Sequence, residues 1–296
     1  MSIPSPQGAL PRHVLILGMG WSGRVLARRL QARGVQVAGT VRDPAAVTDD
    51  GLQRYRLSTD AALPAQLLHA VAAADTVLCS VPPDADGDPA LRLLQAALRA
   101  SPALRWIGYL SSTSVYADRE GGWIDADSAA DSVEPTGVQR RLAEAQWQAL
   151  AQERGIASAV LRLPGLYGPG RNALVQLAQG RARHVVRPGL VFNRLHVDDL
   201  ASVVIAAMQR PRTNAVYLPA DDEPAPPQDV LAFAAQLGGF ALPPAVAWDD
   251  PALSPALRRF YAGHKRIDSR ATRDALGWTP AFPSYREGLR GLFAGR

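Results

Sequence analysis

The stretch VLILGMGWSGRVLARRL, residues Val14 to Leu30, decides the fold of this 296-residue chain. Its apolar start, Val14 to Leu17, is typical of a buried strand and ends at a run that contains three glycines. Gly18, Gly20 and Gly23 have the G-x-G-x-x-G spacing, and apolar residues beyond them repeat with a helical period. The stretch therefore predicts a strand, a tight turn and a helix.

This turn suits a phosphate group. Glycine adopts positive φ and lets the backbone approach a ligand, and a helix N-terminus attracts anions. The glycines alone would also serve an ordinary turn, but a second strand, Val35 to Thr40, completes a βαβ unit and favours a dinucleotide pyrophosphate. We expect the cofactor to contact Gly18, Gly20, Trp21, Ser22 and Gly23.

Strands and helices continue to alternate along the chain. We expect strands at 53–57, 76–81, 105–110 and 157–163, and helices at 63–72 and 89–99. This order predicts an α/β fold of the Rossmann type, a doubly wound parallel sheet. Beyond Leu163 proline and glycine become more frequent, which predicts a smaller C-terminal substrate lobe.

We expect a tail, a dinucleotide-binding domain and a substrate lobe. The tail, residues 1–12, is rich in Pro and Ser, lacks the order of a signal peptide and is expected to be flexible. The dinucleotide-binding domain spans 13–165, and residues 196–220 return to it. The substrate lobe consists of 166–195 and 221–296.

Composition narrows the class of protein. Hydrophobic residues form 47% of the chain, which is enough for a real core. The single cysteine, Cys79, permits no internal disulfide and suits a reducing cytoplasm. No apolar stretch could cross a bilayer, and the 32 basic residues are dispersed among 27 acidic ones. We expect a small-molecule substrate, no membrane or nucleic-acid partner, and a monomer or homodimer.

Four later segments resemble elements of one family. They are GYLSSTSVY at Gly108–Tyr116, LRLPGLYGPG at Leu161–Gly170, LHVDDL at Leu195–Leu200 and LGWTP at Leu276–Pro280. Together with the glycine turn they resemble, in order, the extended short-chain dehydrogenase/reductases, the NAD-dependent epimerase/dehydratase group. The resemblance implies an NAD(P) cofactor and oxidoreductase or epimerase chemistry. The other cofactor contacts that we expect are Ser80, Val81, Pro82, Arg141, Leu163 and Pro164.

The resemblance also exposes a departure. In the family a serine hydrogen-bonds the substrate oxygen, a tyrosine passes a proton, and a lysine four residues later lowers the tyrosine's pKa and holds the ribose. By position the serine is Ser112, but Gly137 stands in place of the tyrosine and Arg141 in place of the lysine. Glycine transfers no proton, and the pKa of arginine is too high for the role of lysine. We therefore expect an atypical mechanism.

Lys265 is the only lysine in the chain, so no shift in alignment restores the pair within the first domain. The segment Tyr261-Ala-Gly-His-Lys265 has the right spacing about a hundred residues too late, where chance is the simpler explanation. Either residue could still reach the cleft if the lobe folds over the cofactor. At the position of Gly165, relatives that act on nucleotide sugars often have an asparagine that holds the substrate. The expected substrate contacts are Ser112, Gly165, Arg194 and Lys265, and arginines that could hold a substrate phosphate are Arg171, Arg183, Arg187 and Arg194.

The end of the second strand bears on the choice of cofactor. Val41 occupies the position expected for a ribose-binding carboxylate, and Arg42 follows it, which favours NADP. NAD remains possible because Asp43 lies about twenty residues beyond the glycines. Directly before Pro44, however, Asp43 is typical of a helix N-cap.

Two further groups of polar residues have structural interpretations. His196, Asp198 and Asp199 could ligate a metal, but their adjacency favours an aspartate that caps a helix and faces its dipole, and we expect no metal. Tyr116 and Tyr167 are expected to pack the loops. The alternative to an enzyme is an NADP(H)-binding sensor or interaction protein with a degenerate active site.

Overall fold

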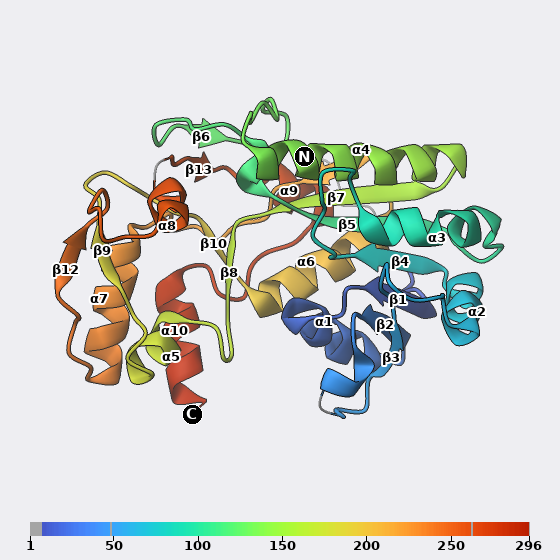
Figure 1. The fold of residues 1–296 in the computed structure, drawn as a ribbon, viewed down its shortest axis with the longest axis horizontal. Helices are drawn as coiled ribbons and strands as arrows, with labels where there is room; N and C mark the ends of the chain where they lie inside the picture. Colours follow the sequence, from blue (N-terminus) through green and yellow to red (C-terminus); the bar gives the residue numbers. More distant parts are fainter. Residues whose placement is uncertain (1–7, 48, 262, 296) are drawn as a thin grey trace.

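The computed structural model describes residues 8–47, 49–261 and 263–295. At its centre lies a seven-stranded sheet in the order β11-β7-β5-β4-β1-β2-β3, with every neighbouring pair parallel (Figure 1). The strands are β1 (His13–Leu17), β2 (Gln36–Val41), β3 (Gln53–Arg56), β4 (Thr76–Cys79), β5 (Trp106–Ser112), β7 (Ala157–Leu163) and β11 (Ala215–Tyr217). The predicted Rossmann-type α/β fold is confirmed.

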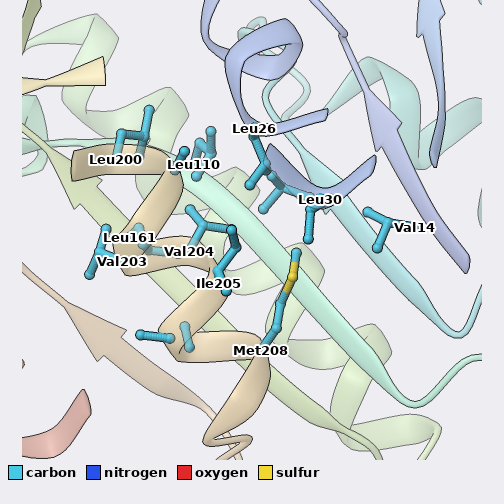
Figure 2. Close-up of a cluster of buried hydrophobic side chains, with 14 of the residues drawn as sticks. Val14, Leu26, Leu30, Leu110, Leu161, Leu200, Val203, Val204, Ile205 and Met208 are labelled. Carbon is cyan, nitrogen blue, oxygen red and sulfur yellow. The ribbon is translucent and has the colours of Figure 1, made fainter. Parts of the chain in front are cut away.

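Helices cover both faces of this sheet because its buried strands are apolar on both sides. On one face Val14 and Ile16 of β1 share a core with α1 (Trp21–Gln31) and α6 (Val197–Gln209) (Figure 2). On the other face Leu15 and Leu17 share a core with three helices. These are α2 (Ala65–Ala73), α3 (Pro89–Ala100) and α4 (Pro135–Glu153). The alternation along β1 thus supplies both layers.

Strand ends differ from the sequence-based ranges where polar residues find distant partners. We expected a strand at 105–110, but β5 runs on to Ser112, which is in register with Leu163 of β7. Ser111 is buried within it because its Oγ donates to Glu144 of α4. The strand expected at 76–81 ends at Cys79.

A smaller lobe lies at the left of Figure 1. Its helices α5 (Ala173–Ala178), α7 (Pro227–Gly238) and α10 (Tyr285–Ala294) surround a separate core.

The remaining elements of the described chain are two helices, two 3₁₀ turns and three strand pairs outside the central sheet. The helices are α8 (Pro255–Phe260) and α9 (Arg270–Leu276), and the 3₁₀ turns are η1 (Pro44–Ala46) and η2 (Thr113–Val115). The three pairs are parallel: β8 (Gly165–Tyr167) with β10 (Arg194–His196), β9 (His184–Val186) with β12 (Ala245–Ala247), and β6 (Trp123–Ile124) with β13 (Arg266–Ile267).

The N-terminal segment is attached to the sheet domain. Of the expected flexible tail, residues 1–7 lie outside the described part of the chain. Residues 8–12 are held by hydrogen bonds: Gly8 N donates to the carbonyl of Gln209 at 2.9 Å, and Arg12 N donates to Asp75 at 2.7 Å. These residues therefore contact the sheet domain, and the flexibility of the tail stays a prediction. Among the described helices, none has the length and apolar character that a membrane span requires.

Candidate functional site

The glycine turn is held tightly between the ends of β2 and β4. Gly18 has φ +80°, and a Cβ there would lie 2.9 Å from Cγ2 of Val81. Its N–H donates to Oγ1 of Thr40 at 3.0 Å, and Ser80 Oγ donates to its carbonyl at 2.6 Å. Only glycine fits this position, since it combines a left-handed backbone with a close approach.

The next two glycines lie at the start of α1: Gly20 is its N-cap and Gly23 is in its first turn. Gly20 is exposed, and a Cβ there would meet nothing nearer than the carbonyl oxygen of Gly18 at 4.0 Å. At Gly23 a Cβ would lie 3.3 Å from Ile16, so this glycine lets α1 pack closely on β1. The first amides of α1 have no partner within the helix. Open backbone at Gly20 and these amides together fit a pyrophosphate.

Trp21, the first residue of α1, connects the turn to the lobe. Its Nε1 donates to the carbonyl of Pro169 at 3.0 Å, and the guanidinium of Arg171 lies 5.0 Å from its ring. The side chain thus spans from the glycine turn to the segment between β8 and α5. Its contact with the cofactor, like that of the half-buried Ser22, stays a prediction.

The end of β2 leaves one cation exposed. Asp43 Oδ1 accepts from Ala45 N at 3.0 Å and caps η1, which confirms the predicted N-cap. Arg42 is exposed, and no residue in the described part of the chain forms a hydrogen bond or ion pair with its side chain. The carboxylate of Asp43 is therefore occupied by a backbone N–H, and the guanidinium of Arg42 is available to a ligand.

A large cavity, about 2080 Å³, opens between the sheet domain and the lobe. Several predicted site residues line it: Pro82, Ser112, Leu163, Pro164, Gly165, Arg194, Tyr261 and Lys265. The glycine turn, Arg42, Ser80, Val81 and Arg141 are not among its lining residues. Ser112 Oγ accepts from Ser114 N at 3.1 Å as the N-cap of η2, so this hydroxyl is fixed at the cavity wall.

The cavity has an excess of positive charge. Its cationic lining residues are Arg140, Arg171, Arg181, Arg183, Arg194 and Lys265, against the carboxylates Asp118 and Glu134. Arg194 donates to the carbonyls of Phe192 and Ala225, and burial lowers its pKa. Arg187, which we expected in this group, stacks instead on Trp248 with its guanidinium 4.5 Å from the ring. The cavity is suited to an anionic molecule.

Position 137 is filled by the chain itself. Gly137 is buried in the first turn of α4, and a Cβ there would lie 2.3 Å from the carbonyl oxygen of Ser114 and 2.6 Å from Ser132 Oγ. A tyrosine side chain has no room because η2 occupies its place. Where the family has a tyrosine, this chain therefore has a glycine against which the backbone of η2 packs closely.

Comparisons with known proteins identify the family of this chain. The model of the NAD-dependent epimerase/dehydratase family matches residues 14–218. The 3-diazoavenalumate denitrifying reductase of Streptomyces sp is 30% identical over 308 aligned positions, which cover 94% of this chain and 99% of that protein. The chain belongs to the NAD-dependent epimerase/dehydratase family. Its members bind NAD(P), and this chain's glycine turn fits that cofactor.

Two solved structures are similar. A conserved protein of unknown function from Silicibacter pomeroyi DSS is 40% identical with a TM-score of 0.86, covering 96% of this chain and 98% of that one. MoeE5 in complex with UDP-glucose and NAD is 21% identical with a TM-score of 0.75, covering 95% and 97%. At that identity the second likeness supports the epimerase/dehydratase fold alone.

In this family member, two neighbouring arginines of α4 differ in their relation to the cavity: Arg140 lines it and Arg141 does not. Arg141 Nη1 donates to the carbonyl of Ser132 at 2.5 Å and does not line the cavity. Arg140 lines it instead and donates to the carbonyl of Leu110 at 3.0 Å and to Tyr109 Oη at 3.1 Å. The predicted cofactor contact of Arg141 stays a prediction, and Arg140, which lines the cavity, was not singled out from the sequence. Helical periodicity could have found Arg140, because residues three and four beyond Gly137 share a face.

The C-terminal lobe does reach the cavity of this family member. Lys265 Nζ donates to the carbonyls of Tyr116 at 2.6 Å and Ala117 at 3.0 Å, and burial lowers its pKa to about 8. Tyr261 lies 5.7 Å from the ring of Phe192, and burial raises its pKa. Residues 263–265 are not helical, so these two residues are no displaced copy of the family's helical Tyr-x-x-x-Lys pair.

A buried ion pair fixes the wall behind Ser112. Arg162 of β7 donates to Glu144 of α4 at 2.8 Å and to Tyr116 Oη at 3.0 Å. The hydroxyl of Tyr116 donates in turn to the carbonyl of Asp125 at 3.1 Å. Tyr167 is likewise buried, with its hydroxyl donating to the carbonyl of Ser284 at 3.3 Å. Both tyrosines pack loops, as predicted.

The family's His-Val-Asp-Asp element is structural in this chain. His196 is the N-cap of α6, since its Nδ1 accepts from Asp198 N at 3.2 Å, and burial lowers its pKa to about 4. The cap is thus histidine and not an aspartate, while both aspartates lie in the first turn. Asp199 accepts from Ala281 N at 2.6 Å. No group of three potential ligands for a metal ion occurs within the described ranges.

Proposed function

We propose that this protein is an NADP(H)-dependent reductase that acts on a small anionic substrate by an atypical mechanism. The observation that carries the proposal is the cavity beside Ser112, which is lined by six cationic residues and only two carboxylates. The bound cofactor supplies a hydride. Ser112 would hydrogen-bond the substrate atom that gains negative charge.

Reduction is favoured over epimerisation by the name of the Streptomyces relative, a reductase at 30% identity. Gly137 supplies no proton donor or base at the position of the family's tyrosine, and Ser114 occupies the space. In either reaction the proton would therefore have to come from another group.

The choice of NADP over NAD rests on the end of β2. Arg42 is exposed and available to a ribose phosphate, whereas the carboxylate of Asp43 is engaged as the cap of η1. We place the reaction in the cytoplasm, in keeping with a single buried cysteine. The substrate would be a free small molecule.

The test begins with cofactor binding and ends with turnover. Purified protein is titrated with NADPH and NADH by nucleotide fluorescence, and NADPH consumption is followed with a panel of aromatic and aliphatic keto acids, aldehyde acids and nucleotide sugars. We expect preferential NADPH binding and consumption with at least one carboxylate-bearing probe.

Ser112→Ala is the informative variant. Loss of its hydroxyl is expected to lower kcat about a hundredfold without changing NADPH affinity. Ser58→Ala, a serine whose hydroxyl bonds only to Asp60 in the described structure, is the control. NADPH binding without consumption of any probe would instead support the sensor or interaction protein.

A further inference from the structure

Lys265 has an unusual anchorage for a lysine that lines a cavity. Its ammonium group carries three N–H bonds. Two are donated to consecutive backbone carbonyls, those of Tyr116 and Ala117. No other residue in the described ranges accepts a hydrogen bond from this group, and its side chain lines the cavity. One N–H is therefore available to a molecule inside it.

We infer that Lys265 is the proton donor of this reductase, supplying from the C-terminal lobe what position 137 cannot. The inference rests on the proposed function and adds to it a catalytic residue. It also restricts the substrate to one in which an atom bonded to the reduced carbon must gain a proton, such as the oxygen of a carbonyl compound.

The anchorage ties the ammonium group to the chain segment that begins at Ser112. Ser112 is the N-cap of η2, Tyr116 directly follows this turn, and Ala117 is the next residue. Ser112, Tyr116 and Ala117 all line the same cavity as Lys265. The inference requires a substrate oxygen that accepts from both Ser112 and the lysine.

The lysine segment is held firmly against this wall. His264 N donates to Asp118 at 2.7 Å, and the carbonyl of His264 accepts from Arg119 N at 3.2 Å. Next to it β13 pairs with β6. Because backbone hydrogen bonds fix residues on both sides of the contact, the ammonium group does not depend on a long free side chain for its position.

The proton transfer balances without a further reactant. With the cofactor bound, its hydride would go to the substrate carbon and the C=O π electron pair would move to oxygen. One N–H bond of Lys265 would break as an O–H bond forms. The neutral amine that remains keeps both N–H bonds to Tyr116 and Ala117, and its lone pair lies where the proton was. Solvent in the cavity returns the proton.

Charges around Lys265 suit this cycle. Burial is the largest effect on its pKa and lowers it to about 8, so the amine exchanges a proton near neutrality. Asp118 and Asp131 raise the pKa, and Arg119 lowers it. An arginine at this position would keep its charge but would not release a proton.

The competing role is positional, since Lys265 also pins the loop after η2. Lys265→Arg retains the cation and its donors, and Lys265→Gln retains two donors without charge. With an NADPH-consuming keto acid as the probe, we expect both variants to lose about a hundredfold or more in kcat with unchanged NADPH affinity. Wild-type kcat should fall above about pH 8, and this pH dependence should vanish in Lys265→Arg. Arg266→Gln, beside it but outside the cavity lining, is the control.

A spectroscopic arm needs no substrate. Because the chain has one lysine, incorporation of lysine labelled with carbon-13 at Cε gives a single lysine resonance. In the ligand-free protein it should titrate near 8 and not at the ordinary 10.5. Titration at the ordinary value, or a Lys265→Arg variant with wild-type kcat and pH profile, overturns the proton donor. Failure of the reductase itself would differ, because then the wild type would consume no NADPH with any probe.

Discussion

Two glycines at opposite ends of the site are used in opposite ways. At Gly20 the space where a side chain would be is open, with the nearest atom 4.0 Å from a Cβ. At Gly137 the same space contains the carbonyl of Ser114 at 2.3 Å. The first glycine leaves room for a ligand, and the second lets two parts of the chain close on each other. An absent side chain is therefore not by itself evidence of an empty site.

The largest effect is expected from putting the family's pair back. Gly137→Tyr with Arg141→Lys forces a ring into the backbone of η2, which should lower the free energy of unfolding by about 5 kcal/mol or more and create no new activity. The matched change, Gly20→Ala, meets open space and a φ of −82°, so stability should change by less than about 1 kcal/mol. Urea denaturation measures both. A stable, active double variant would contradict the conclusion that η2 leaves no room for a side chain at position 137.

The second prediction concerns the ion pair that holds α4 against the sheet. Glu144→Gln leaves the guanidinium of Arg162 buried without its anion, which is expected to cost about 3 to 5 kcal/mol of stability. Glu153→Gln breaks the ion pair with Arg99, which is about half exposed, and should cost less than about 1 kcal/mol. Equal losses in urea denaturation would show that Glu144 does not hold α4 in place.

The third prediction is that the free energy of unfolding depends on pH through His196. This residue caps α6, the helix that packs on α1 behind the glycine turn. Its folded pKa of about 4 lies below the ordinary 6.5, so the unfolded chain binds the proton first. Its contribution to stability is therefore complete above 6.5 and is lost as pH falls towards 4, by about 3 kcal/mol in total.

His196→Asn tests this because asparagine can also cap the helix but does not titrate. Stability is measured by chemical denaturation from neutral pH to about pH 4, and over this range the wild type should lose up to about 3 kcal/mol more than the variant. The raised pKa of Asp221 has the opposite effect on stability, but it is common to both proteins and cancels in the difference. Parallel curves would contradict the assignment to His196.

The contrast between the two glycines also marks how far sequence alone could lead. β7 has the bounds predicted from its apolar run, Ala157–Leu163, and the glycine turn and Asp43 cap lie where local patterns put them. These features depend on neighbours in sequence. The cationic wall does not, because Lys265 is held by carbonyls 148 and 149 residues away. No periodicity encodes such a pairing.

Gly137 shows the same limit. The substitution was visible in the sequence, but its meaning depends on Ser114, which arrives from another element. Arg140 is an intermediate case: helical periodicity allows it to share a face with position 137, but only the hydrogen bond of Arg141 to Ser132 shows which arginine turns away. Local patterns therefore predicted the glycine turn better than the surroundings of Gly137.

The smallest expected effect is on cofactor affinity, and it tests whether Arg42 at the end of β2 selects NADP. Arg42→Ala removes the exposed guanidinium at the end of β2, and loss of one charged contact to phosphate should weaken NADPH binding about tenfold to a hundredfold. NADH affinity should not change, because NADH has no phosphate at this position. Arg33→Ala, an exposed arginine in the turn after α1, is the control for net charge. Equal losses for both nucleotides in fluorescence titrations would assign Arg42 to the shared part of the cofactor and remove the basis for preferring NADP.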